Sequence, residues 1–305
     1  MKYCKGLVSV VIVSFNQRDC LKRCIYSLLN QSYPYLDIII VNNGRKENLD
    51  DFGVDLSYLK VINNKENFFF SQAQNQGIQA SRGEFVLSLN DDVVLEGDFI
   101  DELVKTIIPN KRIGMVSGKI LRMDKITIDS TGLFLGKSRK PVERGFNEKD
   151  NGQYNKEGYI FGVSGAAAFY RRAMLEDIRD ENGYFDERYG MFYEDLDLAW
   201  RANIRGWYAY YNPKAVAYHK RGSSAKTVSP GLRFLKKYNF AYLNDELKVK
   251  LVKNRYMTMI KNDSPWGIIV NLPFILAYEI KLYVYIILFS PKLLGRILKG
   301  LPDLC

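Results

Sequence analysis

The chain has 305 residues, of which 47% are hydrophobic and 26% charged, and this composition excludes a disordered protein. The length suits one large domain, or one domain with an appendage. The formal net charge of +10 is uneven, because residues 226–305 hold 13 Lys/Arg against 5 Asp/Glu. A basic segment of this kind favours an anionic partner, which leaves a membrane surface or a nucleic acid.

Four cysteines occur, and none of them forms a CxxC pair. Cys20 and Cys24 share a helical spacing, but no second Cys/His pair accompanies them, so buried thiols in a reducing cytosol are expected rather than a metal site. We expect no secretory leader, because the apolar run from Leu7 to Val13 is short and lacks a cleavage site.

The N-terminal part of the chain alternates apolar runs with segments of helical periodicity. The predicted elements are a strand at 8–15, a helix at 19–29, strands at 37–42 and 59–62, a helix at 71–80 and a strand at 84–89. Such alternation predicts an α/β fold whose mainly parallel central sheet is flanked by helices. Ligands bind at the carboxyl ends of the strands in sheets of this kind.

The next segments continue this pattern with a helix at 98–108 and a strand at 113–116. Residues 121–159 are polar and poorly periodic, and we interpret them as a mobile loop region over the site. Ordered structure is expected to resume at 163–170, followed by a helix at 194–205 and a strand at 215–219. The chain is predicted to be helical and basic from about residue 227, which gives a catalytic domain at 1–225 and a helical C-terminal extension at 226–305.

Three polar residues, Asn90, Asp91 and Asp92, follow the predicted strand at 84–89. Their carboxylates would project from the sheet edge, where hard cations such as Mg²⁺ or Mn²⁺ bind one or two carboxylates together with phosphate oxygens. An acidic turn or a helix N-cap is the plainer alternative for such a triplet. The triplet therefore needs partners elsewhere in the chain before it indicates a metal site.

A second acidic group, Glu194 and Asp195, begins a predicted helix after three bulky apolar residues, Met191 to Tyr193. Helix capping by a solvated acidic face would explain the acids alone. The bulky residues would also desolvate the carboxylates, which is how a carboxylate is tuned to act as a general base. We predict that Asp195 is this base and that Glu194 orients it or contacts an acceptor.

His219 is the single histidine in the chain, and it ends a predicted strand directly before Lys220 and Arg221. A lone histidine is usually an ordinary surface or core residue. Its place at a strand end beside two cations favours a role in holding a metal or a diphosphate, with Lys220 and Arg221 neutralising phosphate charge. Ordinary surface charge is the alternative for the two cations.

Taken together, these motifs resemble the inverting glycosyltransferases of family 2, which have the GT-A fold. The resemblance covers about residues 7–224. The residues that carry it are VSVVIVSFN at 8–16, QSYP at 31–34, IIVNN at 39–43, Asn67, Ala73, Asn75, Gly77, LNDDV at 89–93, Gly165, FDE at 185–187, Glu194, Asp195, His219, Gly222 and Ser223.

The resemblance implies specific roles for residues of this chain. Asp92 would bind the Mg²⁺ or Mn²⁺ ion together with His219, and Asp195 would be the base. The remaining donor-binding residues would be Ser14, Phe15, Asn16, Asn42, Asn75, Asn90, Asp91, Lys220 and Arg221. The expected reaction is the transfer of a sugar from a nucleoside-diphosphate sugar to a hydroxyl of a glycan or a lipid-linked glycan.

Two positions depart from the family pattern, since Asn42 and Asn90 stand where aspartate is usual. The amide of Asn42 can still pair with uracil or thymine, which leaves UDP-linked and dTDP-linked donors open. Arg144-Gly145 and the segment 150–154 resemble a loop of bacterial rhamnosyltransferases that use dTDP-L-rhamnose in O-antigen or cell-wall polysaccharide synthesis. L-rhamnose is therefore the favoured donor sugar.

A nucleotidyltransferase or a non-catalytic nucleotide-binding module is the alternative function, because both can carry acids at strand ends. A nucleotidyltransferase usually has a glycine-rich phosphate loop after its first strand. This chain has Ser14-Phe15-Asn16-Gln17 there, which argues against that class.

The C-terminal run from Trp266 to Phe289 is long enough to span a bilayer, but Pro273, Glu279 and Lys281 interrupt it. We expect helices that lie at the lipid interface with basic flanks rather than a spanning helix. This hydrophobicity favours a membrane surface over nucleic acid as the partner. The expected location is cytoplasmic, peripheral on the inner face of the cell membrane.

Overall fold

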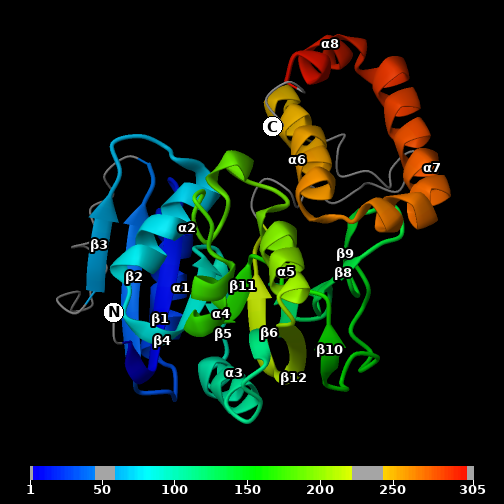
Figure 1. Cartoon of the computed structure of the whole chain (residues 1–305). Helices are drawn as coiled ribbons and strands as arrows, with labels where there is room; N and C mark the ends of the chain where they lie inside the picture. The colour runs from blue at the N-terminus through cyan, green and yellow to red at the C-terminus, as the bar shows by residue number, and fades with distance from the viewer. Residues whose placement is uncertain (1–2, 45–58, 222–242, 301–305) are drawn as a thin grey trace. The chain divides into compact units, whose positions relative to one another are not determined.

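The computed structural model describes residues 3–44, 59–221 and 243–300, which divide into two units (Figure 1). Unit 1 comprises Met1–Phe134 and Glu143–Lys220. Unit 2 comprises Leu135–Val142 and Arg221–Cys305. The division after Lys220 lies close to the expected domain boundary, but the inclusion of 135–142 in unit 2 had no signal in the sequence.

Unit 1 is built on a ten-stranded sheet with the order β10-β12-β6-β11-β4-β1-β2-β3, to which β5 is added on β12 and β7 on β6. The strands are β1 (Cys4–Ser14), β2 (Leu36–Asn42), β3 (Leu59–Asn63), β4 (Gly83–Asn90), β5 (Val93–Leu95), β6 (Ile113–Arg122), β7 (Ile128–Ser130), β10 (Gly158–Ile160), β11 (Ala167–Arg171) and β12 (Tyr208–His219). Strands β8 (Leu133–Leu135) and β9 (Pro141–Glu143) pair separately.

The strands β3, β2, β1 and β4 are parallel, as the alternation of strands and helices predicts. β12 also runs parallel to β6. Between these two groups β11 is antiparallel to both β4 and β6, so the sheet as a whole is mixed. This strand direction sets the start of β11 beside the end of β4, where the acidic triplet lies.

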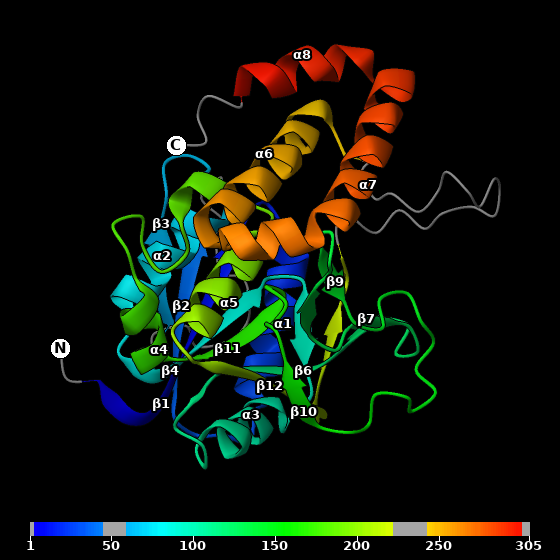
Figure 2. The same ribbon diagram turned by 45° about the vertical axis from the view of Figure 1, so that its right-hand side comes forward.

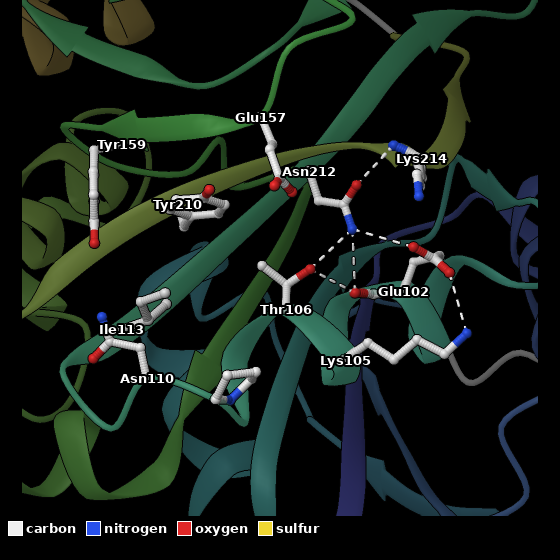
Figure 3. Close-up of a pocket in the computed structure, with 11 residues that line it drawn as sticks. Glu102, Lys105, Thr106, Asn110, Ile113, Glu157, Tyr159, Tyr210, Asn212 and Lys214 are labelled. Atoms are coloured by element: carbon white, nitrogen blue, oxygen red, sulfur yellow. Dashed lines mark hydrogen bonds and ion pairs between the residues drawn. The ribbon is translucent and has the colours of Figure 1, made fainter.

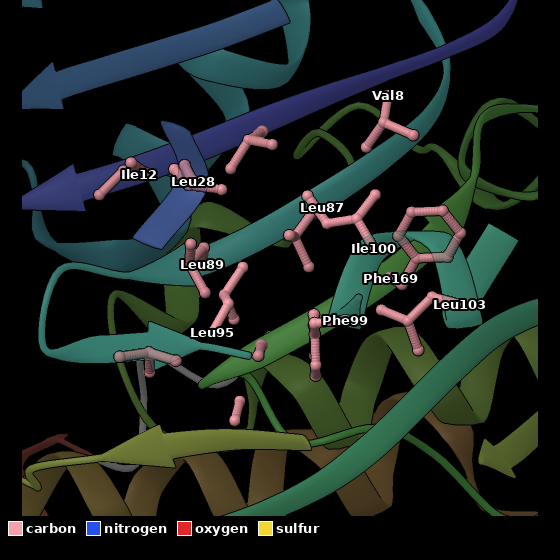
Figure 4. Packing of buried hydrophobic residues seen from close by; sticks show 14 of the residues in the cluster. Val8, Ile12, Leu28, Leu87, Leu89, Leu95, Phe99, Ile100, Leu103 and Phe169 are labelled. Atoms are coloured by element: carbon pink, nitrogen blue, oxygen red, sulfur yellow. The ribbon is translucent and has the colours of Figure 1, made fainter. Parts of the chain in front are cut away.

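Helices cover both faces of the sheet because its strands are apolar on both sides. Val8, Val10 and Ile12 pack toward α1 (Arg18–Leu29) and α3 (Phe99–Ile107), and Figure 4 shows part of this cluster. Val11 packs into a second cluster on the other face, to which α2 (Phe69–Ala80), α4 (Arg172–Ile178) and α5 (Glu194–Ile204) contribute. Each fully buried aliphatic side chain of this kind contributes about 1.5–3 kcal/mol.

The segment 121–159, which we expected to be a mobile loop, contains ordered structure, so that prediction is wrong. β6 extends to Arg122, β7, β8 and β9 lie inside the segment, and β10 begins in it. Lys119 pairs with Asp150 at 2.8 Å, and the guanidinium of Arg144 lies over the rings of Phe134, Tyr154 and Tyr211. Such cation–π and ion-pair contacts leave no hydrophobic periodicity, which is why the sequence pattern did not reveal this order.

Unit 2 contains α6 (Asp245–Asn262), α7 (Pro265–Phe289) and α8 (Pro291–Gly300), which follow one another in Figure 2. Val252, Leu282 and Ile286 lie in their shared apolar cluster. The predicted helical character is present from 245 to 300, whereas residues 227–242 lie outside the part of the chain that the structure describes.

Polar contacts join the same elements within unit 2. Arg255 Nε lies 2.8 Å from Glu279 Oε1, and Arg139 Nε lies 2.5 Å from Asp263 Oδ2. By length and composition α7 could cross a membrane, with a mean hydropathy of 1.8 in its most apolar window and only 17% of that window buried. Most of α7 therefore presents apolar side chains that unit 2 does not cover.

Candidate functional site

Three parallel strands end at one edge of the sheet, and each brings a predicted site residue there. Ser14 of β1 is in register with Asn42 of β2, and Val13 of β1 is in register with Asn90 of β4. Ser14 and Asn42 are buried. The sheet thus assembles Ser14, Asn42 and Asn90 at one edge.

The loops after β1 and β2 pack against each other at this edge. The backbone N–H of Asn43 donates to Ser14 O at 2.8 Å, and a Cβ added to Gly44 would lie only 2.7 Å from Asn16 Oδ1. Asn16 has a left-handed φ of 56°, and the ring of Phe15 is 46% exposed. Asn42 Nδ2 donates to Asn63 Oδ1 at 3.1 Å. A buried amide beside an exposed aromatic ring is a surface on which a flat heterocycle can pack.

The acidic triplet forms the turn between β4 and β5. Asp91 is 9% exposed, and Asp92 O accepts a hydrogen bond from the backbone N–H of Lys220 at 3.0 Å. The thiol of Cys24 lies beneath the turn and donates to Asn90 O at 3.7 Å. Burial raises the pKa of this thiol well above its usual value, and the negative charges of Asp91 and Asp92 raise it further. Cys20 and Cys24 are both buried and free, as expected.

His219, at the end of β12, lies between two carboxylates. Its Nε2 is 3.1 Å from Asp92 Oδ1, and its Nδ1 is 2.8 Å from Asp129 Oδ2. Burial lowers the pKa of His219, but the hydrogen bonds to Asp129 and Asp92 outweigh this effect and raise the pKa to about 9. Because Asp129 holds Nδ1, the other ring nitrogen faces Asp92.

Asp129 is the residue that sequence reasoning missed. Its side chain is fully buried, and besides His219 it has Arg122 Nε at 4.0 Å from Oδ1. It lies on β7, inside the segment that we expected to be loop. A buried carboxylate requires a partner, but no spacing in the sequence connects Asp129 with a histidine 90 residues later.

Asp195 lies in the first turn of α5 and is connected to the triplet through the turn that precedes β11. Its Oδ2 accepts from the backbone N–H of Gly165 at 3.2 Å, and its Oδ1 accepts from the N–H of Leu196 at 2.8 Å. The next residue, Ala166, accepts from the N–H of Asn90 at 2.9 Å. One hydrogen bond to the Asp195 carboxylate and one backbone hydrogen bond therefore join the predicted base to the acidic turn.

The acids of α5 have different environments. Asp197 is fully buried and pairs with Arg201 at 2.8 Å, so its role is to anchor the helix. Glu194 is 9% exposed, whereas Asp195 is only partly buried. Phe192 and Tyr193 enter the helix with left-handed φ values of 70° and 71°, which is a costly conformation that proteins retain chiefly at functional sites.

The remaining predicted residues have other neighbours. Asn75 is buried on α2, where it donates to Phe185 O at 2.8 Å and accepts from Phe185 N at 3.0 Å. Its amide thus fixes the backbone around residue 185. Lys220 Nζ lies 3.4 Å from Cys20 Sγ, and Arg221 follows with a φ of 50°.

The chemistry of Asp92 and His219 fits a divalent cation. A carboxylate oxygen and an imidazole nitrogen are both ligands of Mn²⁺, and Mg²⁺ or Mn²⁺ sites commonly use few protein ligands together with phosphate oxygens. Within residues 3–44, 59–221 and 243–300, no three His, Cys, Asp or Glu side chains cluster as a complete set of metal ligands. A diphosphate would have to supply the remaining oxygens.

Comparison with known proteins defines the family. Residues 9–179, more than half of the chain, match the model of Glycosyl transferase family 2, and the chain belongs to this family. Poly-beta-1,6-N-acetyl-D-glucosamine synthase of Staphylococcus epidermidis is 23% identical over 214 residues, which are 69% of this chain and 49% of that protein. Putative glycosyltransferase EpsH of Bacillus subtilis is 26% identical over 176 residues, 55% of this chain and 48% of that protein. The chain spans about half the length of these relatives.

Solved structures show that the fold is of the GT-A type. GalNAc-T7 with UDP, GalNAc and Mn²⁺ superposes with a TM-score of 0.61 at 16% identity, covering 83% of this chain and 48% of that one. The mannosyltransferase PcManGT of Pyrobaculum calidifontis, in complex with GDP-Man and Mn²⁺, gives a TM-score of 0.54 at 15% identity, covering 97% and 74%. Both neighbours share the α/β architecture described above.

Proposed function

We propose that this chain transfers a sugar from a nucleoside-diphosphate sugar to a hydroxyl of a glycan or a lipid-linked glycan, with inversion at the anomeric carbon. The observation that carries the proposal is the path from Asn90, two residues before Asp92, through Ala166 and Gly165 to Asp195. This path supports a site in which the turn at 90–92 binds the diphosphate and Asp195 is the base. Membership of family 2 supports the same reaction.

Asp195 acts as the general base in this mechanism. It accepts the proton of the acceptor hydroxyl while the oxygen attacks the anomeric carbon opposite the departing diphosphate, so one displacement inverts the configuration. The hydrogen bonds from the N–H groups of Gly165 and Leu196 hold the carboxylate in one orientation. A positioned base of this kind contributes roughly 10²–10⁴-fold to the rate. Glu194 orients Asp195 or contacts the acceptor.

Asp92 and His219 would hold a Mg²⁺ or Mn²⁺ ion, and Asp129 would fix the imidazole so that Nε2 points to the ion. When bound, the ion supplies positive charge to the departing diphosphate. Lys220 and Arg221 supply further positive charge to the same phosphates. The presence of Mn²⁺ in the GalNAc-T7 and PcManGT structures supports a divalent cation in this fold.

The nucleoside would bind at the ends of β1 and β2. Phe15 offers its exposed ring to a pyrimidine, and the amide of Asn42 can pair with the ring N–H and a carbonyl of uracil or thymine. Ser14, Asn16 and Asp91 would line the same pocket, with Asn90 at the β4 edge. Asn75 supports the pocket through the backbone of Phe185.

L-rhamnose from dTDP-rhamnose is the donor that we favour. The support is the resemblance of Arg144-Gly145 and residues 150–154 to rhamnosyltransferases. In this chain Arg144 and Asp150 make internal contacts, with three aromatic rings and with Lys119 respectively. A panel of donors is therefore the decisive measurement.

The test is the release of nucleoside diphosphate from a panel of UDP- and dTDP-linked sugars, with and without Mn²⁺. We expect release from one donor class, dependence on the ion, and strong weakening of ion-dependent donor binding in Asp92→Ala. Release of pyrophosphate from a nucleoside triphosphate would instead identify a nucleotidyltransferase. Donor binding without any release would identify a non-catalytic nucleotide-binding module.

We further propose that α7 and α8 of unit 2 lie on a lipid surface, at the cytoplasmic face of the cell membrane. Ile269, Ile280 and Leu288 are 60%, 63% and 67% exposed. The exposed cations Lys292, Arg296 and Lys299 follow on α8. Apolar side chains flanked by cations are typical of interfacial helices. Such docking would give the enzyme access to a lipid-linked acceptor.

A further inference from the structure

A cavity lies in unit 1, and neither the triplet nor His219 lines it. Its volume is about 640 Å³, and its walls come from the C-terminal half of α3, residues 109–110, the start of β6, β10 and the first half of β12 (Figure 3). None of the predicted site residues lines it. The proposed reaction therefore leaves this cavity without a role.

The cavity lies along the first half of β12, and His219 ends the same strand. Tyr210, Asn212 and Lys214 line the cavity, and His219 is nine, seven and five residues further along. At about 3.3 Å per residue, these separations are roughly 15–30 Å, slightly shortened by the irregularity between Asn212 and Val216. A small ligand held at Tyr210 would therefore not reach His219.

Three tyrosine rings meet beside the cavity. The ring of Tyr159 packs edge-to-face against Tyr208 at 5.5 Å and against Tyr210 at 5.1 Å. Tyr159 is 61% exposed and Tyr208 is 47% exposed. Aromatic rings held rigidly by one another but open to solvent offer flat apolar faces at little entropic cost. The C–H face of a sugar ring is well suited to such a surface, because its polarised hydrogens meet the negative face of the aromatic ring.

Polar groups around these rings remain available to a ligand. Among the described residues, no side-chain hydrogen bond or ion pair involves the carboxylate of Glu157, the ammonium of Lys214 or the hydroxyls of Tyr159 and Tyr210. Asn212 instead forms the floor, where it is 4% exposed and donates to Thr106 Oγ1 at 2.9 Å. Figure 3 shows Asn212 beside Glu157, with dashed lines from its amide to Thr106 and Glu102.

The charges at the cavity are balanced. Glu102 and Glu157 supply two carboxylates, and Lys105 and Lys214 supply two ammonium groups. Lys105 is already paired with Asp101 at 2.6 Å and with Glu102 at 3.2 Å. A polyanion such as a nucleic acid would meet no excess of positive charge here. A neutral ligand with many hydroxyls would find both donors and acceptors.

We propose that this cavity is a second carbohydrate-binding site, which holds a neutral stretch of the glycan acceptor or product far from the reaction centre. The inference rests on the proposed glycosyltransferase function. A glycan long enough to reach both places would be bound at two points, so that the second contact becomes intramolecular. Long acceptors would then bind more tightly than short ones with no change at the reacting atoms.

The test uses the full chain on an array of short and long neutral and acidic oligosaccharides. We expect the wild type to retain long neutral oligosaccharides and Tyr159→Ala to bind them about tenfold more weakly, which corresponds to roughly 1.4 kcal/mol for the loss of one stacked aromatic ring. Tyr159→Phe keeps the ring and should retain most of the binding. Tyr35→Ala is the matched control, because Tyr35 is 65% exposed and packs edge-to-face on Tyr33 outside the cavity.

A kinetic measurement complements the array. In Tyr159→Ala the KM for a long acceptor should rise about tenfold, while kcat and the KM for a short acceptor stay unchanged. Equal effects on both acceptors, equal losses in Tyr35→Ala, or retention of acidic oligosaccharides alone would each overturn the inference. Asp92→Ala separates the two ideas, because it should lose nucleoside-diphosphate release yet still be retained by the neutral array. A wild type that releases no nucleoside diphosphate but is retained would refute the proposed function only.

Discussion

At the scale of single residues, some side chains of the candidate site belong to recognisable sequence motifs and others do not. Asp92 and Asp195 follow recognisable motifs, and the resemblance to family 2 places them near each other. His219 draws notice because it is the single histidine. Asp129, which orients that histidine, lies in a three-residue strand without periodicity. Its role depends on a contact between distant segments, which a single sequence does not encode in any local pattern.

Replacing Asp195 tests the proposed base. Asp195→Asn should lower kcat by roughly 10²–10⁴-fold while donor affinity stays near that of the wild type, because the amide keeps the shape of the side chain but cannot accept the proton. Donor binding by calorimetry and transfer rates at saturating donor would show the two effects separately. Turnover at the wild-type rate would disprove the assignment.

A second substitution tests the orienting role of Asp129. Asp129→Asn should raise the Mn²⁺ concentration needed for half-maximal donor hydrolysis about 10–100-fold, since partners of metal-binding histidines have effects of this size. The asparagine preserves the volume at this buried position. A titration of donor hydrolysis against Mn²⁺ measures the shift.

Asp98→Asn is a suitable control for this titration, because Asp98 is an exposed carboxylate of unit 1 whose side chain caps no helix N–H. It should leave the Mn²⁺ dependence unchanged. An unaltered titration in Asp129→Asn would show that Asp129 serves only the packing of β7.

At the scale of elements, the parallel half of the sheet could be predicted, since β1, β2 and β4 are mostly apolar and separated by helical segments. The antiparallel direction of β11 could not, because strand direction depends on the path of the chain between β10 and β11. β12 was predicted to begin at Ala215 and in fact begins at Tyr208. Pro213 lies inside the longer strand, where a proline is tolerated mainly at an irregularity such as the one between Asn212 and Val216.

Gly118 of β6 lies opposite this irregularity. A Cβ at Gly118 would lie 2.3 Å from Ala215 O and 2.6 Å from the ring of Phe99. Because a backbone oxygen cannot move as a flexible side chain can, Gly118→Ala should destabilise unit 1 by about 1–3 kcal/mol. Denaturant unfolding monitored by tryptophan fluorescence would measure the loss.

Gly158→Ala, on the edge strand β10, is the matched control. A Cβ there meets no atom within 4 Å. Its unfolding midpoint should remain close to that of the wild type. Equal midpoints for both alanine variants would mean that β12 can shift to make room at Gly118.

At the scale of the whole molecule, unit 2 provides partners for a polar residue of its long helix that composition alone does not reveal. Glu279 lies within the apolar run, where a lone charge is costly in a membrane. In the structure it binds Arg255 at 2.8 Å and accepts a hydrogen bond from Tyr256 at 2.6 Å. Both partners belong to α6, so contacts within unit 2 offset the desolvation energy of the Glu279 carboxylate. Lys281 is exposed and can reach a headgroup layer.

The remaining cations of unit 2 give the membrane proposal its test. Lys292 and Lys299 are exposed on α8 and make no ion pair among the described residues. Each exposed cation near an anionic surface contributes about 1 kcal/mol. The double variant Lys292→Gln/Lys299→Gln should therefore bind vesicles of phosphatidylcholine and phosphatidylglycerol roughly thirtyfold more weakly. Cosedimentation at low and high salt would measure this change.

The double variant Lys111→Gln/Lys149→Gln provides the control, because it removes the same charge from exposed lysines of unit 1. It should sediment with the vesicles as the wild type does, and all three proteins should hydrolyse the donor at equal rates. Screening by salt should weaken wild-type binding, since interfacial attraction of this kind is electrostatic in part. Carbonate should extract the chain from native membranes. A chain that only detergent releases would contradict interfacial docking and would assign α7 as a spanning helix.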